Sequence, residues 1–326
     1  MRIWTLVATC LCAPVCLHAQ AMDDLQAVRH PIDSLPISAR FRLPASPDWL
    51  AAAFGAIWVV NYDPSALHRL DPKTDSLVAT IPLGDDACLG IAVGPRSLWV
   101  PSCGTGELNE IDPGTNTVVR RYPVRIGPGR EGAVAYTDGS VWLPINRPDT
   151  TSTLIARIDP ANGRVVAAIP VPPRSDVVVA GFSAVWVASS TANQVVRIDT
   201  RVNAIVARIP VGTSPKFMAV GEDALWVQNR ADGSISRLDP TTNMEQARVQ
   251  TDAPTKWGDL AAGAGGVWLS VNGHPVTRID PRSNRVTHQF IGGEGADAIR
   301  VAFGSLWVAD HMHGEVWRIP LARLSP

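Results

Sequence analysis

The chain has 326 residues, with 29 basic and 30 acidic side chains and a formal net charge of −1. This balance gives no electrostatic reason to expect a nucleic acid or an anionic membrane as a partner, and we expect neither. Hydrophobic residues make up 46% of the chain, enough for a sizeable core, and its 26 glycines and 27 prolines indicate many turns and little helix.

The first 21 residues have the pattern of a signal peptide. Arg2 supplies a positive charge, residues 3–17 are mostly apolar, and small residues at Ala19 and Ala21 fit a cleavage site. The apolar run is too short and too interrupted to span a membrane, with an uncleaved anchor as the alternative. We therefore expect a periplasmic or secreted protein, with a linker over residues 22–36.

Seven near-identical units follow, each marked by a tryptophan in a run such as GAIWVV or GSLWVA. A run such as LHRLDP follows each of the first six, then in several units one such as LVATIPLG, and an apolar run precedes each tryptophan. Each unit thus predicts four short strands, and the whole predicts an all-β, seven-bladed propeller over residues 37–326. The tryptophans recur every 39 to 44 residues, at Trp58, Trp99, Trp142, Trp186, Trp226, Trp268 and Trp307.

The turns and the chain ends agree with this fold. In turns such as DPKTDS and DPRSNR, proline supplies the φ angle that the second turn position needs, and the preceding aspartate can accept hydrogen bonds from the turn backbone. The seventh unit supplies only three strands. Residues 37–44 match the outer-strand pattern, and we expect them to complete the last blade and close the ring.

Two cysteines remain after the predicted cleavage. Counting outward from the turn near Pro95 and Arg96 places Cys88 and Cys103 opposite each other on adjacent antiparallel strands. This spacing predicts a disulfide, which an exported protein permits. Two free thiols or a metal-binding pair are the alternatives.

One face of the ring carries the unusual residues. In a propeller blade, the loop entering the inner strand and the loop leaving the second strand share a face, where binding residues are expected. Trp49 and Trp257 in the incoming loops offer stacking surfaces, and Asp259 enters from the same face. The positions ten residues before each tryptophan face the channel mouth and include four charged residues: Asp48, Asp176, Lys216 and Asp297.

The last unit concentrates groups capable of chemistry. Arg300 is the one long side chain among small residues at the position seven before each tryptophan. Either it clamps an anion or a carbonyl, or it simply pairs with Asp297. Register counting places Asp297 opposite Asp310, a pair suited to a divalent cation such as Mg²⁺ or Ca²⁺.

Histidines cluster next to this pair. His311 and His313 follow Asp310 directly, and His274 occupies the equivalent loop of the preceding unit. A histidine there suits general acid–base work near neutral pH, and Arg300 could assist. The alternative is that these loop histidines are solvent-exposed and without a role.

The repeat, with LWV followed by V-x-R-I-D-P and by I-P-V-G, resembles the YVTN-type repeat propellers and is similar to the streptogramin (virginiamycin B) lyase group, from about residue 37 to 326. That resemblance implies histidines and an acid in channel-facing loops and a divalent cation. Asp310 would stand in the acid's place. The chain departs from the group where it has PKFM instead of a PHGI-type stretch, and where Met312 separates two histidines.

Two functions from different classes remain open. In the first, the chain is an exported, non-catalytic propeller that binds a small molecule or a cell-envelope ligand at its loop face. In the second, it is a divalent-cation-assisted lyase or hydrolase that acts from the same channel mouth. A lyase would abstract a proton next to a carbonyl whose oxygen the cation polarises. We expect a monomer in either case.

Overall fold

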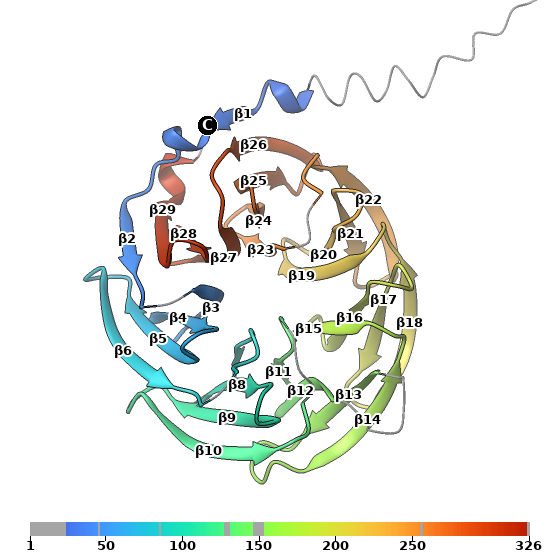
Figure 1. Ribbon diagram of the computed structural model, residues 1–326. Helices are drawn as coiled ribbons and strands as arrows, with labels where there is room; N and C mark the ends of the chain where they lie inside the picture. Colours follow the sequence, from blue (N-terminus) through green and yellow to red (C-terminus); the bar gives the residue numbers. More distant parts are fainter. Residues whose placement is uncertain are drawn as a thin grey trace, which may run out of the picture.

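The seven repeat units fold as seven sheets arranged in a closed ring, which confirms the predicted propeller (Figure 1). The computed structural model describes residues 24–44, 46–84, 86–126, 131–145, 153–254 and 257–324. The predicted signal peptide lies outside these residues. No helix in these segments is long and apolar enough to cross a membrane.

Each blade is an antiparallel sheet whose strands follow one another outward from the channel. Blades 1 to 3 consist of β3 (Pro47–Ala53), β4 (Ala56–Asn61), β5 (Ala66–Asp71) and β6 (Ser76–Pro82); β7 (Ala92–Val93), β8 (Leu98–Ser102), β9 (Glu107–Asp112) and β10 (Thr117–Pro123); and β11 (Ala135–Thr137), β12 (Ser140–Ile145), β13 (Thr153–Ile158) and β14 (Val165–Val171).

Blades 4 to 6 continue the order, and the three strands of blade 7 follow. They consist of β15 (Ser175–Gly181), β16 (Ala184–Ser189), β17 (Gln194–Asp199) and β18 (Ala204–Pro210); β19 (Pro215–Gly221), β20 (Ala224–Asn229), β21 (Ser234–Asp239) and β22 (Met244–Gln250); β23 (Asp259–Gly263), β24 (Gly266–Val271), β25 (His274–Asp280) and β26 (Arg285–Ile291); and β27 (Ala296–Ala302), β28 (Ser305–Asp310) and β29 (Glu315–Pro320).

The chain closes the ring with a strand from its N-terminal part. β2 (Ala39–Arg42) pairs antiparallel with β29, as predicted for residues 37–44 (Figure 1). The segment assigned to a linker also contains β1 (Arg29–Pro31), which adds to β26 as a parallel fifth strand of blade 6. The 3-10 helix η1 (Ile32–Ser34) connects toward β2, and a second, η2 (Leu321–Arg323), follows β29.

The repeated tryptophans fill the space between blades, as predicted. Their residues are between 0 and 3% exposed. Each pairs directly across from the residue seven positions before it, which is small in most blades; Ala51 opposes Trp58, for example. In five blades the indole N–H donates to the backbone oxygen five residues earlier, as from Trp186 to Gly181 at 3.0 Å. A small partner opposite a large ring lets neighbouring blades approach closely.

The arginine of the repeated R-I-D-P stretch ties adjacent blades together. Arg197 lies over the ring of Trp186, with its guanidinium carbon 5.2 Å from the ring centroid. It donates to the Pro240 backbone oxygen and the Asn243 side chain, both in the turn of the next blade, at 2.7 and 2.9 Å. Equivalent contacts start from Arg69, Arg157, Arg237 and Arg318.

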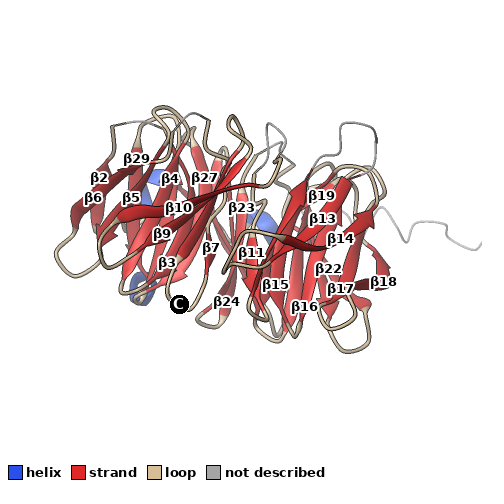
Figure 2. Cartoon of the chain, turned by 90° about the horizontal axis from the view of Figure 1, so that it is seen from below, coloured by secondary structure: helices blue, strands red, loops and turns tan. Residues whose placement is uncertain are grey.

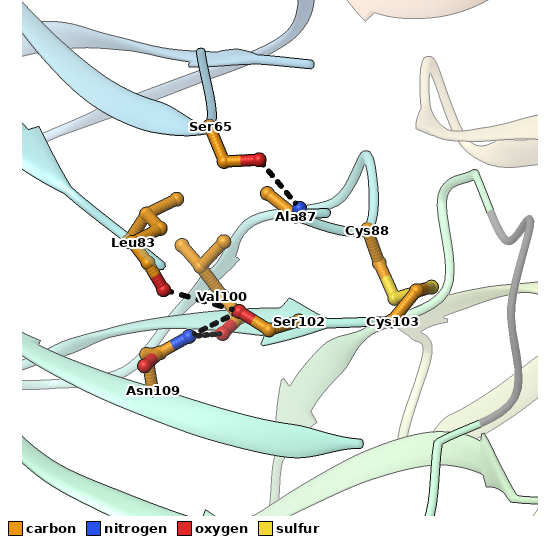
Figure 3. Close-up of a disulfide and its surroundings, with 8 residues drawn as sticks. All are labelled: Ser65, Leu83, Ala87, Cys88, Val100, Ser102, Cys103 and Asn109. Carbon is orange, nitrogen blue, oxygen red and sulfur yellow. Dashed lines mark hydrogen bonds between the residues drawn. A yellow bond between two sulfur atoms is a disulfide. The ribbon is translucent and has the colours of Figure 1, made fainter. Parts of the chain in front are cut away.

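Blade 2 is stapled by the predicted disulfide between Cys88 and Cys103, whose Cα atoms are 5.0 Å apart (Figure 3). The predicted register holds near the turn, where Ala92 faces Trp99. It then shifts, because Ala87 pairs with Ser102. The cysteines are therefore not directly opposite, and the irregular backbone between residues 88 and 91 accommodates the link.

Seen from the side, the strands run roughly along the ring axis, so that connecting loops gather on two opposite faces (Figure 2). The tight turns before each tryptophan lie on one face. The incoming loops of the inner strands and the outgoing loops of the second strands meet on the other, as their shared lining of one cavity shows.

Candidate functional site

Charged side chains reach the channel mouth through β-bulges. In β3, β15, β19 and β27 the pairing with the second strand shifts around the position ten residues before the tryptophan. A bulge leaves an extra residue out of the ladder and re-aims its side chain. The bulged stretches carry the four charged residues predicted for the mouth: Asp48, Asp176, Lys216 and Asp297.

We call the first cavity at the mouth the acidic pocket. Its volume is about 260 Å³, and incoming and outgoing loops of blades 1, 2, 3, 6 and 7 line it. Three carboxylates and one imidazole line it together with the amide of Asn272, and two exposed aromatic rings form part of its rim. These residues are Asp48, Glu131, Asp297 and His311, with Tyr62 and Trp257.

Three potential ligand groups converge inside this pocket. Asp48, Asp297 and His311 each offer one atom, and these atoms lie within 4.8 Å of one another. Nδ1 of His311 lies 3.5 Å from Oδ2 of Asp48. That nitrogen is buried and has no hydrogen-bond partner within the described part of the chain. Asp48 is 6% exposed.

The surroundings make ionisation of the two aspartates unfavourable. Burial raises the pKa of Asp48 well above its ordinary value of 3.8, and nearby carboxylates, led by Asp297, raise it further. Burial likewise raises the pKa of Asp297 to about 7, with Glu131 the strongest of the neighbouring charges. At neutral pH the pair therefore favours a shared proton or a bound cation.

Arg300 does not compensate this pair. It forms an ion pair with Asp259, whose side chain is only 2% exposed. The backbone N–H of Leu260 also donates to that carboxylate, at 2.7 Å. The alternative that Arg300 pairs with Asp297 is thus wrong, and Asp259, predicted to bind ligand, is instead occupied by Arg300.

Trp49 lies in the channel next to the pocket and contacts residues of blades 3, 5 and 7. Its ring lies 5.8 Å from that of Phe217 on blade 5, and the guanidinium carbon of Arg300 lies 4.8 Å from its centroid. A Cβ on Gly132 of blade 3 would come within 2.9 Å of the ring, so only glycine fits there. Trp49 is 9% exposed; it forms the floor of the mouth and is not an open stacking surface.

An ion pair that the sequence analysis missed divides the mouth. Lys216 pairs with Glu131, which precedes β11 and joins the loop of blade 2 through a bridge to Leu89. Glu131 lies eleven residues before its tryptophan, one position away from the counted register. An acidic residue in an incoming loop was the signal that could have identified it. The inner strands of blades 2 and 3 are short, so counting ten residues back from the tryptophan does not reach the residue at the mouth there.

The predicted pairing of Asp297 with Asp310 is wrong. Asp310 opposes Ala296, because the bulge in β27 shifts the register. Its carboxylate instead lies 2.8 Å from Nδ1 of His313 and accepts the backbone N–H of that residue at 3.1 Å. Both residues line a separate groove beside the N-terminal segment. The predicted histidine pair is therefore split between two cavities.

Of the predicted residues Trp257 and His274, only Trp257 lines the acidic pocket. Trp257 is 59% exposed and lines the acidic pocket. His274 does not line that pocket. Burial lowers its pKa, Arg29 of the N-terminal strand lowers it further, and Asp252 opposes the shift. His274 thus faces the seam with blade 5.

A second cavity at the mouth, the basic pocket, has a volume of about 430 Å³. Arg174 and Lys216 contribute positive charge from incoming loops, and Arg230 contributes it from the outgoing loop of blade 5. Asp176 lies among them, and its charge and that of Glu131 act on Arg230. Lys216 and Asp176, predicted to bind ligand, are therefore placed here rather than in the acidic pocket.

Comparisons with known proteins establish the fold alone. No protein-family model and no curated protein matches the chain. The solved structure of streptogramin B lyase aligns with a TM-score of 0.69 at 16% identity, covering 86% of this chain and 95% of that one. U3-55K aligns with a TM-score of 0.69 at 11% identity, covering 87% and 99%. The structure of the RRP9 WD40 repeats aligns with a TM-score of 0.69 at 12% identity, covering 88% of this chain and 99% of that one. Such different proteins share this fold, so function must be argued from the site.

Proposed function

We propose that this chain is an exported β-propeller that binds a positively charged small molecule or cell-envelope ligand in the acidic pocket. One observation carries this proposal. Glu131 and Asp259 form ion pairs with Lys216 and Arg300, whereas among the described residues neither Asp48 nor Asp297 forms an ion pair with a lysine or an arginine, and Asp48 has only the neighbouring imidazole of His311. Burying carboxylates without a partner is costly, so the pair favours a cation supplied from outside.

Export is supported by two features. The pattern of residues 1–21 is that of a signal peptide, and the Cys88–Cys103 disulfide is a bond that persists in oxidising compartments. The test is non-reducing mass spectrometry of the protein recovered from the periplasm and the medium. We expect a mature N-terminus after Ala19 or Ala21 and no free thiol. Recovery only from the cytoplasm would contradict export.

Calorimetric titration tests ligand binding. The probes are Mg²⁺, Ca²⁺ and phenethylammonium, titrated into the wild type and into Asp297→Asn. We expect at least one probe to bind the wild type and to lose most of its affinity in the variant. Asp223→Asn, the same change in a tight turn on the opposite face, is the control and should bind as the wild type does. Failure of all three probes to bind the wild type would refute a cation site here.

A divalent-cation-assisted lyase is the second candidate, because two carboxylates whose oxygens suit a hard cation converge with an imidazole that can accept a proton. Asp48 and Asp297 would hold the cation, which would polarise a carbonyl oxygen when bound. His311 would accept the proton next to that carbonyl. Incubation with streptogramin B and Mg²⁺, followed by mass spectrometry, tests this candidate. Turnover that is lost in His311→Ala would support a lyase; an unchanged substrate would exclude this activity.

A further inference from the structure

The acidic and basic pockets adjoin each other on the same face of the ring. Glu131 lines the acidic pocket and Lys216 lines the basic one, and the two side chains form an ion pair. Lys216 also lies close enough to Asp48 and Asp297 for its charge to oppose the rise in their pKa values that burial causes. The ion pair is thus the partition between two cavities of opposite charge.

The acidic pocket has the chemistry of an organic ammonium site. Asp48 is more than nine-tenths buried and points into the cavity, and the nearby Nδ1 of His311 is buried without a hydrogen-bond partner among the described residues. Tyr62 and Trp257 are 52% and 59% exposed at the rim. Carboxylates beside aromatic faces are the combination that recognises ammonium groups.

The basic pocket has the chemistry of an oxyanion site. Two guanidinium groups, from Arg174 and Arg230, line it together with the side chains of Ser190 and Thr191. Planar guanidinium forks match carboxylate and phosphate oxygens, and the Ser190 hydroxyl can add a further donor. The Thr191 hydroxyl already donates to the backbone oxygen of Pro173 at 3.1 Å. Lys216 is engaged by Glu131, and among the other described lining residues two guanidinium groups face one carboxylate, that of Asp176.

We propose that the mouth binds a zwitterion, with its ammonium group in the acidic pocket and its carboxylate or phosphate group in the basic pocket. This inference rests on the proposed cation-binding function and names the class of ligand. The two charges of the ligand would lie on either side of the Lys216–Glu131 partition. A ligand with only one charge would fill only one pocket and leave the other without its counter-charge.

The test is calorimetric titration with a matched set of probes. Trialanine with free ends is the carboxylate zwitterion and phosphoethanolamine is the phosphate zwitterion. Trialanine amide keeps only the positive charge, and N-acetyl-trialanine keeps only the negative charge. We expect at least one zwitterion to bind about tenfold more tightly than either singly charged peptide, because each charged hydrogen bond contributes to affinity. Which zwitterion binds identifies the anionic group.

Variants assign each charge to its pocket. Arg174→Gln, at an exposed position, should lower affinity for the zwitterion about tenfold and leave that for trialanine amide unchanged. Arg230→Gln should do the same, and its melting temperature shows whether it is folded. Asp297→Asn should weaken both. If trialanine amide binds as tightly as both zwitterions, the inference falls and the proposed function stands. If no probe with an ammonium group binds, both fall.

Discussion

Nδ1 of His311 lies 3.5 Å from Oδ2 of Asp48 across the seam between blades 7 and 1. The same seam is held on the other face by Arg318, which donates to the backbone oxygen of Pro72 and to Asp75. The acidic pocket therefore takes its reactive groups from the first and last blades. Its geometry depends on ring closure, which brings these two blades together.

The contribution of Asp48 and Asp297 to the stability of the protein should fall as the pH rises from about 4 to 7. In the folded state, burial raises the pKa of Asp297 to about 7 and that of Asp48 in the same direction, against an ordinary value of 3.8. Between these values the two carboxyl groups bind more protons in the folded state than in the unfolded state, so they make the free energy of unfolding decrease with pH. His68, whose pKa burial lowers to about 4, acts in the opposite direction. Urea unfolding at pH 4, 5.5, 7 and 8 measures this slope.

Asp297→Asn should make the slope of the free energy of unfolding against pH more positive than in the wild type, because it removes one of the two carboxyl groups with a raised pKa. It should also make the protein more stable than the wild type at pH 8, where the wild type must hold a buried negative charge. Asp223→Asn on the opposite face should keep the wild-type slope. Equal slopes in all three proteins would show that Asp297 does not titrate in this range.

Arg300→Met should destabilise the protein by about 3–5 kcal/mol, because it leaves the carboxylate of Asp259 buried without a partner. The double variant Arg300→Met with Asp259→Asn should recover part of this loss, since no charge then remains buried. Urea unfolding of the single and double variants measures both values. A double variant that is less stable than Arg300→Met would contradict a simple ion pair.

Cys103→Ser should lower the free energy of unfolding by about 3 kcal/mol, the value typical for a loop of this size; the bridged residues are 15 apart in sequence. Reduction of the wild type should give a similar loss. Urea unfolding with and without reductant makes the comparison. A reductant effect on Cys103→Ser itself would point to a cause other than this bond.

Deletion of residues up to Pro44 should prevent cooperative unfolding and cause aggregation, because it exposes the edge of β29. Deletion up to Pro31 should have a smaller effect. We expect some loss of stability, since β1 pairs with β26 and Arg29 contacts Asp252 and Gln289. Thermal unfolding and light scattering separate these outcomes. A monomeric, cooperatively folded protein without β2 would exclude closure by this strand.

The fold could be predicted from the sequence because its signals repeat. Seven tryptophans at similar spacing and six turns with aspartate at the same position all indicate one unit. Even the closing strand β2 has the residue pattern of the outer strands of the other blades. β1 could not be predicted in this way, because its three residues, Arg29, His30 and Pro31, show no alternation of apolar and polar side chains.

The site was predicted less well, because side-chain direction depends on local irregularities. Counting back from each tryptophan located Asp48, Lys216 and Asp297 at the mouth. The same count was wrong beyond the bulges. One extra residue in β27 shifts the pairing there, so that Ala296, and not Asp297, lies opposite Asp310. Glu131 was missed because the inner strand β11 is short and Glu131 lies before it, outside the counted register. A bulge has no reliable sequence signal, so register arguments lose accuracy at the strand ends that carry function.

Ring closure by β2 has a consequence for assembly. The edge of β29 that receives β2 is identical in every copy of the chain, and the two strands are separated in sequence by most of the protein. A long loop must close within one chain before this pairing forms, whereas at high concentration the β2 of a second copy competes for the same edge. Refolding of concentrated protein therefore favours strand-exchanged dimers, in which each ring is completed by the other molecule.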